Sequence, residues 1–410
     1  MLSAINNFTL TMQAKRMFHP FNFFIEKGHR ILLFGIISFL LIVCNCNNKS
    51  KQNNQEQCSS DLHLAASQGN KSRIRNLIKD GAKVNQRDKD GRTPLHLAAE
   101  KGYKDCITIL IESGADVNQK DNDDCTPYTI EPFPFLTKQG FTALHLAADK
   151  GHASCVQYLI EKGANVNQKN RCGQIPLHLA AKNNHPDCVQ YLIEKGSNVN
   201  QLDCNEQSPL QLAIAMYLGI SMNSKEGIKH LTCIKSLINQ GTNLNQLDKR
   251  GYAPLHLAIR RDYASCVAIL INNKADVNLK DKQGQTPLQL AIEMNNPSYI
   301  TALIKGGANV NLKDKYGSAP LHAAADQGHS DCISALIKGG ACVNQKSDFL
   351  GLAPLHRAVL KNNVHCVTAL IKGGADVNLQ DNNGQTPLHL AMERKYSNCI
   401  AILQSNGGKG

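Results

Sequence analysis

The chain has 410 residues, of which 42% are hydrophobic and 5% aromatic, and it contains no tryptophan, which suits a core of Ala, Leu, Ile and Val. The formal net charge of +12 raises the question of a nucleic-acid partner, but residues 1–57 hold six Lys or Arg against two Glu and the remaining charge is dispersed along the chain. Because a nucleic-acid footprint is a concentrated basic stripe, we expect no nucleic-acid binding.

The N-terminus contains the only long apolar run, ILLFGIISFLLIV, which spans 13 residues from Ile31 to Val43. Such a run is shorter than the roughly 20 residues that a spanning helix needs. Lys27 and Arg30 precede it, so the order of basic and apolar segments matches a secretory signal. The sequence therefore predicts a lead at 1–30, an apolar signal or membrane-anchor segment at 31–46 and a polar linker at 47–57.

The tetrapeptide LIVC that ends at Cys44 resembles a bacterial lipoprotein signal, which implies lipidation of Cys44. Val43 departs from that pattern, because such signals carry a small residue there, and Cys46 is an alternative site. A short uncleaved membrane anchor is an alternative interpretation, and the true start is Met12 or Met17 if the long lead is not translated. We expect a membrane-associated or secreted protein rather than a cytoplasmic one.

A heptapeptide that reads TPLHLAA at Thr93–Ala99 occurs in ten versions after residue 59. The proline position, counted with its equivalents, advances in steps of 33, 49, 33, 33, 45, 33, 33, 34 and 33 residues. A fixed period of this length indicates a repeat architecture. Each unit then buries its apolar face against its neighbours, so that the core grows linearly with the number of units.

The period and the sequence motif of these units resemble the ankyrin repeat family, and a complete unit runs from Asp88 to Lys120. The resemblance covers about ten units and places the repeat domain at 58–408. It implies an all-α fold, an α-solenoid in which each unit is a helix–turn–helix plus a hairpin loop. It also implies a protein-binding scaffold, not an enzyme.

Within a unit, each helix boundary has a local signal. Thr93 can cap the first helix and Pro94 suits its first position. The second helix is expected from about Lys104 to Ser113, since Ile107, Leu110 and Ile111 are at helical spacing. Gly114 follows, where a left-handed residue ends a helix.

Two insertions interrupt the period, near 125–138 and near 216–230. We interpret the first as an enlarged loop, because Pro132 and Pro134 would break a helix. The second lies between the two helices of its unit. Neither holds a plausible acid–base or nucleophile set, and the chain shows no phosphate-binding glycine loop. We therefore expect no catalytic residue and no cofactor.

Eight cysteines occupy one repeat position: Cys106, Cys155, Cys188, Cys233, Cys266, Cys332, Cys366 and Cys399. Equivalent positions on stacked helices are about 8–10 Å apart, beyond the roughly 7 Å that a disulfide bridges between Cα atoms. One His and one thiolate per unit also fall short of four metal ligands. We interpret these cysteines as small buried apolar residues and expect no metal. Four loop cysteines show no paired framework, which favours a reducing compartment: Cys125, Cys172, Cys204 and Cys342.

The motif histidine recurs in eight units, so we interpret it as structural. Its ring can bridge backbone or threonine groups between loops and helices. Gln211 and Gln289 replace it in two units and keep the capacity to hydrogen-bond.

The resemblance implies that partner contacts come from the hairpin tips and the exposed side of the first helix. Those positions form a basic section of Lys249, Arg250, Tyr252, Arg260 and Arg261. They also form an apolar section of Phe349, Leu350, Leu352 and Leu360, with Tyr316 in the unit before. Exposed apolar residues suggest a binding patch; the alternative is that they pack against the next unit's loop. We expect a monomer that binds a protein partner. An inert spacer, or a regulator or enzyme acting through the insertions, is the alternative.

The N-terminal leader, by which we mean residues 1–57, can be tested on its own. Fused to a soluble reporter, residues 1–57 should direct the reporter to the membrane or to the secreted fraction, because a basic segment precedes an apolar run. Cell fractionation measures the outcome, and a reporter that stays in the cytosol contradicts the expectation. Acyl labelling of Cys44→Ala separates lipidation from plain anchoring.

Overall fold

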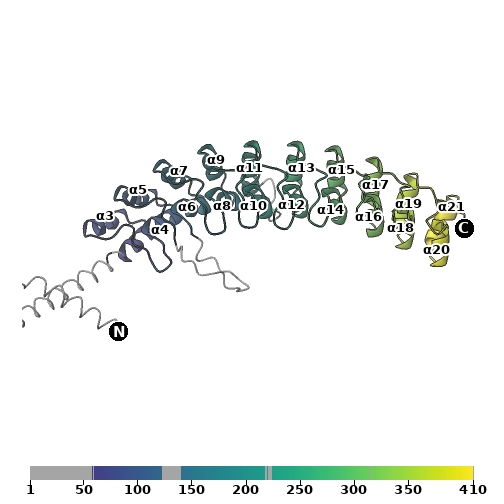
Figure 1. Ribbon diagram of the computed structural model, residues 1–410, viewed down its shortest axis with the longest axis horizontal. Coiled ribbons are helices and arrows are strands. Elements are labelled where there is room, and N and C mark those ends of the chain that lie inside the picture. Colours follow the sequence, from purple (N-terminus) through teal and green to yellow (C-terminus); the bar gives the residue numbers. More distant parts are fainter. Residues whose placement is uncertain are drawn as a thin grey trace, which may run out of the picture.

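The computed structural model describes residues 58, 60–121, 140–217, 219, 224–314 and 316–409, and over these residues it contains helices and turns but no strand. Figure 1 shows the helices in two rows that follow an arc from the N-terminal to the C-terminal end. First helices form the inner row, second helices form the outer row, and connecting loops extend below the inner row. The expected all-α solenoid is confirmed.

The first helix of each unit is short, seven or eight residues in the elements with assigned bounds. In the first unit, residues 60–67 are helical. The others are α4 (Pro94–Lys101), α6 (Ala143–Lys150), α8 (Pro176–Lys182), α10 (Pro209–Ala215), α12 (Pro254–Arg260), α14 (Pro287–Glu293), α16 (Pro320–Gln327), α18 (Pro354–Leu360) and α20 (Pro387–Glu393).

The second helix of each unit has nine residues, except α11, which has 15. These helices are α3 (Lys71–Lys79), α5 (Lys104–Glu112), α7 (Ala153–Glu161), α9 (Pro186–Glu194), α11 (Lys225–Asn239), α13 (Ala264–Asn272), α15 (Pro297–Lys305), α17 (Ser330–Lys338), α19 (Val364–Lys372) and α21 (Ser397–Ser405).

The motif residues define how a first helix begins and what it buries. Thr93 is extended and Pro94 starts α4, as the sequence predicts. Leu95, Ala98 and Ala99 have no exposed surface. The small alanines allow α4 and α6 to approach closely, and each first helix also packs on the second helix of its own unit. The core is therefore continuous along the stack rather than confined to single units.

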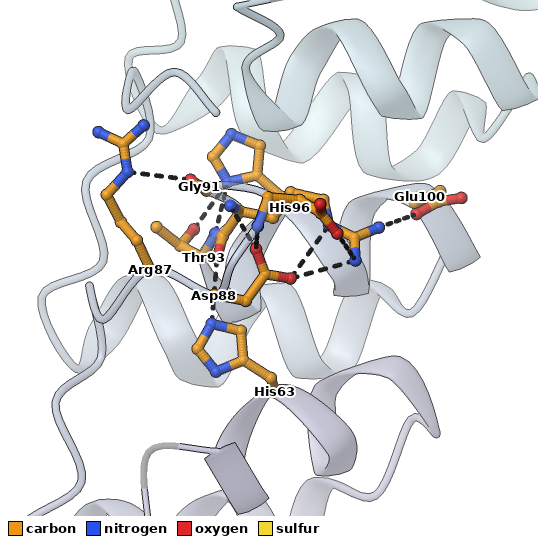
Figure 2. A network of polar contacts seen from close by, with 9 residues as sticks. His63, Arg87, Asp88, Gly91, Thr93, His96 and Glu100 are labelled. Carbon is orange, nitrogen blue, oxygen red and sulfur yellow. Dashed lines mark hydrogen bonds and ion pairs between the residues drawn. The ribbon is translucent and has the colours of Figure 1, made fainter. Parts of the chain in front are cut away.

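The motif histidine joins its unit to the next one, as Figure 2 shows for His63, whose Nε2 lies 3.0 Å from the Arg92 carbonyl oxygen. The Thr93 N–H lies 3.1 Å from His96 Nδ1. An N–H only donates, so Nδ1 accepts and the ring proton is on Nε2. That Nε2 donates to the Phe141 carbonyl in the next unit, at 3.0 Å. The predicted structural role is confirmed.

Gln211 reproduces this bridge in a unit without the histidine, and Gln289 reproduces the half of it within its own unit. Gln211 Oε1 accepts from the Ser208 N–H at 2.9 Å, and Gln211 Nε2 donates to the Tyr252 carbonyl at 2.9 Å. Gln289 Oε1 likewise accepts from the Thr286 N–H at 2.8 Å. The bridge therefore needs one acceptor and one donor at fixed separation, not an imidazole.

A second bridge, which the sequence interpretation missed, runs through the asparagines of the link segments. Asn118 Nδ2 donates to the Gly163 carbonyl at 3.1 Å, and its Oδ1 accepts from the Asn165 N–H at 2.8 Å. Asparagines at the same position accept an N–H from the next unit in every link of the described solenoid: Asn85, Asn118, Asn167, Asn200, Asn245, Asn278, Asn311, Asn344 and Asn378.

The stack continues across both insertions. The first is closed at its base, because the Asp121 N–H donates to the Phe141 carbonyl at 2.7 Å and the Phe141 N–H donates to Asp121 Oδ1 at 2.7 Å. The loop expected at 125–138 lies outside the described residues. The second insertion lies between α10 and α11, as expected, and part of it is helical because α11 begins at Lys225.

An aromatic cluster anchors the second insertion. The Tyr217 ring stacks on the Tyr263 ring with centroids 3.8 Å apart and 6° between the planes. His230 Nδ1 lies 2.9 Å from the Tyr263 hydroxyl oxygen, and His230 Nε2 lies 2.9 Å from the Ala213 carbonyl oxygen. The buried Tyr263 thereby ties α10, α11 and the next unit together.

Burial of the bridging histidines predicts that stability falls as the pH falls. Loss of solvent lowers the pKa of His96, His145 and His178 to about 4, against 6.5 when unfolded. The unfolded chain therefore binds more protons between these values, and the free energy of unfolding decreases from about pH 6.5 towards pH 4. For residues 58–410, the midpoint of urea unfolding should be lower at pH 5 than at pH 7.

The chain supplies a matched control for this pH dependence. His178→Gln should keep both hydrogen bonds, as Gln211 does, but lose one titrating ring. Its midpoint should therefore change less between the two pH values. Identical pH responses of the variant and the parent chain would show that the buried ring does not cause the loss.

Candidate functional site

A hollow on the surface lies between the units of α16 and α18. Its volume is about 330 Å³, and its lining includes Tyr316, Phe349, Leu350, Asp326 and Arg357. A second hollow of about 310 Å³ shares Tyr316 with it and extends towards Gln285 and Glu293. Together they form a groove along three consecutive hairpins, and we call it the C-terminal groove.

Three apolar side chains stand at the rim of this groove. Phe349 is 85% exposed, Tyr316 is 65% exposed and Leu350 is 43% exposed. These three come from two adjacent hairpins and all line the first hollow. The structure therefore brings together three of the residues that the sequence proposed for partner contact.

The hairpin that carries Phe349 is one residue longer than usual, which corresponds to the step of 34 in the sequence. In the preceding hairpin, Asp314 Oδ1 accepts the N–H groups of Tyr316 and Ser318 at 2.8 and 2.9 Å. Here Ser347 holds the equivalent place, and its N–H donates to the Leu352 carbonyl at 3.0 Å. The extra residue enlarges the tip that carries Phe349 and Leu350.

Two members of the expected apolar section lie elsewhere. Leu352 is only 5% exposed, so its assignment to the exposed surface is wrong. Its carbonyl accepts from His322 Nε2 at 3.0 Å, which holds this residue against the preceding unit. Leu360 is half-buried and packs on the core. The exposed apolar section therefore consists of Tyr316, Phe349 and Leu350.

The groove also has a charged floor. Arg357 replaces the usual leucine of the motif, and its Nη1 lies 3.1 Å from Asp326 Oδ2. Both side chains are about 30% exposed, at 27% and 31%. Arg357 Nε is buried and has no hydrogen-bond partner among the described residues. An apolar rim above a few polar groups is the usual composition of a site that binds another molecule.

The basic section forms a separate cluster on the unit of α12, in its hairpin and at the end of its first helix. Lys249, Arg250, Arg260 and Arg261 are exposed. The Arg260 guanidinium lies 4.5 Å from the centroid of the Tyr252 ring, a cation–π contact that orders both side chains. The Lys249 N–H donates to the Asn205 carbonyl at 2.9 Å, which holds this hairpin beside the preceding one.

The periodic cysteines are all buried, each with at most 1% exposure. Burial raises the pKa of Cys188 and Cys233 to about 12 and that of Cys332 and Cys366 to about 11. Within the part of the chain that the structure describes, no group of three or more His, Cys, Asp or Glu residues is arranged to hold a metal. The interpretation of the eight periodic cysteines as small apolar core residues is confirmed.

Two of the loop cysteines lie close together. Cys172 and Cys204 lie on adjacent hairpins, and the Cys204 N–H donates to the Cys172 carbonyl at 2.7 Å. Both are free thiols in the structure, and the contact between their hairpins is one that the sequence interpretation did not include. Counting spacings along the sequence does not reveal which hairpins touch.

The comparisons with known proteins agree with this architecture. The model described as ankyrin repeats (3 copies) matches residues 29–121, 144–222, 220–314, 275–347, 301–381 and 321–409. The model described as ankyrin repeats (many copies) matches residues 96–160. The chain belongs to the ankyrin repeat family, whose repeats are generally protein–protein interaction modules and typically non-enzymatic scaffolds. A comparison with curated proteins gave no match.

The predicted leader, including Cys44, lies outside the described residues. Among the helices that the structure does describe, none combines the length and the apolar character required to cross a bilayer.

Accessibility of the thiols can be measured directly. Brief native alkylation of the reduced chain should modify the exposed Cys204 and Cys342, while the eight periodic cysteines react only after denaturation. Burial blocks the reagent and keeps those thiols protonated. Mass spectrometry of both samples gives the labelled positions. Rapid native labelling of most periodic cysteines, or a ladder of disulfide-linked peptides, contradicts the assignment.

Proposed function

We propose that this chain recognises a protein partner through the C-terminal groove and the basic section. The observation that carries the proposal is the 85% exposure of Phe349 beside Tyr316 and Leu350 over a hollow. An exposed cluster of large apolar side chains is costly in water and marks interaction sites on soluble surfaces. A spacer without a partner has no use for such a cluster.

The two sections give the partner a defined chemistry. An apolar side chain of the partner would pack in the groove between Phe349 and Tyr316, and an acidic patch would face Arg260 and Arg261. Buried aromatic anchors dominate binding energy, while peripheral charges mainly set the association rate. The two sections are three unit steps apart, or roughly 24–30 Å at 8–10 Å per stacked helix, so the partner surface is extended.

We also propose that the recognition domain is tethered to a membrane or exported through its N-terminal segment. The support is the order of basic, apolar and polar segments in residues 27–57. In this arrangement the linker at 47–57 separates the solenoid from the membrane. We propose that the solenoid acts as a monomer, since each unit buries its apolar face against its neighbours.

Substitutions in the two sections should affect different rate constants. Once a partner is isolated with residues 58–410 as bait, Phe349→Ala should accelerate dissociation and cost about 2 kcal/mol of binding free energy. Arg260→Glu combined with Arg261→Glu should slow association and reduce its dependence on salt. Surface plasmon resonance measures both rate constants.

The matched control is Ile228→Ala, which removes another exposed apolar side chain, 57% accessible, from the outer-row helix α11. It should leave the kinetics unchanged. Circular dichroism confirms that each variant is folded. Parent-like kinetics for both groove and basic-section variants would place the binding surface elsewhere on the solenoid.

A further inference from the structure

Two thiols lie at the tips of adjacent hairpins, outside the C-terminal groove. Cys172 is in the hairpin that precedes α8, and Cys204 is in the hairpin that precedes α10. Cys204 Sγ lies 2.9 Å from the Cys172 carbonyl oxygen, which also accepts the Cys204 N–H at 2.7 Å. A Cβ atom placed on Gly173 would lie 3.3 Å from the Asp203 Cα atom, so the two backbones are in direct contact.

This contact belongs to a recurring connection between hairpins. In each case the donor is the N–H of the residue five positions before one motif proline. The acceptor is the carbonyl of the residue four positions before the motif proline of the preceding unit. The same bond joins Lys249 to Asn205 at 2.9 Å and Asn382 to Leu350 at 3.1 Å. Among the units of this sequence, only Cys172 and Cys204 place cysteine at both connected positions.

The separation between Cys172 and Cys204 is compatible with a disulfide bond. With standard bond lengths, the 2.7 Å bond from the Cys204 N–H to the Cys172 carbonyl keeps the two Cα atoms within about 7 Å of each other. Disulfides span about 4.4–6.8 Å between Cα atoms. Periodic cysteines of neighbouring units, on stacked helices about 8–10 Å apart, are outside this range. Both loop thiols are also reachable, since Cys204 is exposed and Cys172 is half-buried.

We propose that Cys172 and Cys204 are a modification site that forms an intramolecular disulfide by exchange with a low-molecular-weight disulfide such as oxidised glutathione. The exposed Cys204 loses its proton to solvent, and its thiolate attacks one sulfur of glutathione disulfide. One glutathione thiolate leaves, and Cys204 carries a mixed disulfide. The Cys172 thiolate, formed by loss of its proton to solvent, then attacks the Cys204 sulfur and displaces the second glutathione.

The order of attack follows from the surroundings of the two sulfurs. Burial and the neighbouring Cys204 raise the pKa of the Cys172 thiol, so the exposed partner reacts first with the external disulfide. Overall, two protein thiols are oxidised and one glutathione disulfide is reduced to two thiols. The product fixes two adjacent hairpins to each other, independently of whether the C-terminal groove binds a protein.

The test uses the full-length chain, first reduced and freed of reductant, then incubated with oxidised glutathione. Remaining thiols are blocked with N-ethylmaleimide in denaturant before digestion with trypsin. Cys172 and Cys204 are the only cysteines in the expected peptides 172–182 and 196–225. A linked pair of these peptides, two hydrogen atoms lighter than their sum and separated by reductant, is the expected product.

Single variants distinguish this product from random oxidation. In Cys172→Ser, Cys204 should keep its glutathione adduct, because the second thiol is missing. In Cys342→Ser, which removes an exposed cysteine from another loop, the linked pair should form as in the parent chain. Separate glutathione adducts on Cys172 and Cys204 in the parent chain, two unmodified thiols beside a modified Cys342, or a disulfide between two chains would overturn the proposal.

Discussion

The hydrogen bonds that pass from each unit to the next are the constraint on which the rest of the structure depends. His96 and its equivalents join a helix start to the carbonyl of the following hairpin, and Asn118 and its equivalents join successive link segments. Each bond contributes only about 1 kcal/mol, but the same bonds recur along the whole stack. They fix the distance and the rotation between units.

Because these bonds lie at the bases of the hairpins, the residues at the hairpin tips can differ between units without disrupting the stacking of the units. The tip before α18 carries Phe349 and Leu350, the tip before α12 carries Lys249 and Arg250, and Cys204 stands at the tip before α10. The C-terminal groove exists because two bases are held side by side while their tips project apolar side chains. Packing and recognition are therefore separated within each unit.

Much of this architecture could be predicted from repetition in the sequence. Helix starts such as Thr93–Pro94, the buried Cys106 and the structural histidine follow from residues that recur at one position, and a feature that recurs in most units is structural. The position of Leu352 could not be predicted in the same way. Counting from the motif proline predicts an exposed side chain, whereas the bond from His322 to the Leu352 carbonyl holds this residue against the preceding unit and its side chain is buried.

The contact of Cys172 with Cys204 and the asparagine bridges were missed for a related reason. Both join residues that are about one repeat apart, and only the stacking geometry shows which positions meet. The asparagine was visible as a recurring residue in the links, but its two partners are backbone groups with no signature in the sequence. Side-chain patterns reveal a core better than they reveal bonds to the backbone.

The central claim is that one uninterrupted stack carries the recognition surface across both insertions. Amide hydrogen exchange at Asn165 and Asn243 tests it most directly. Their N–H groups donate to Asn118 and Asn200, which lie on the other side of the first and the second insertion, at 2.8 and 2.7 Å. The account predicts slow exchange at both, comparable to helix amides. Exchange as fast as in an open loop would show that the insertions divide the solenoid and would contradict the account.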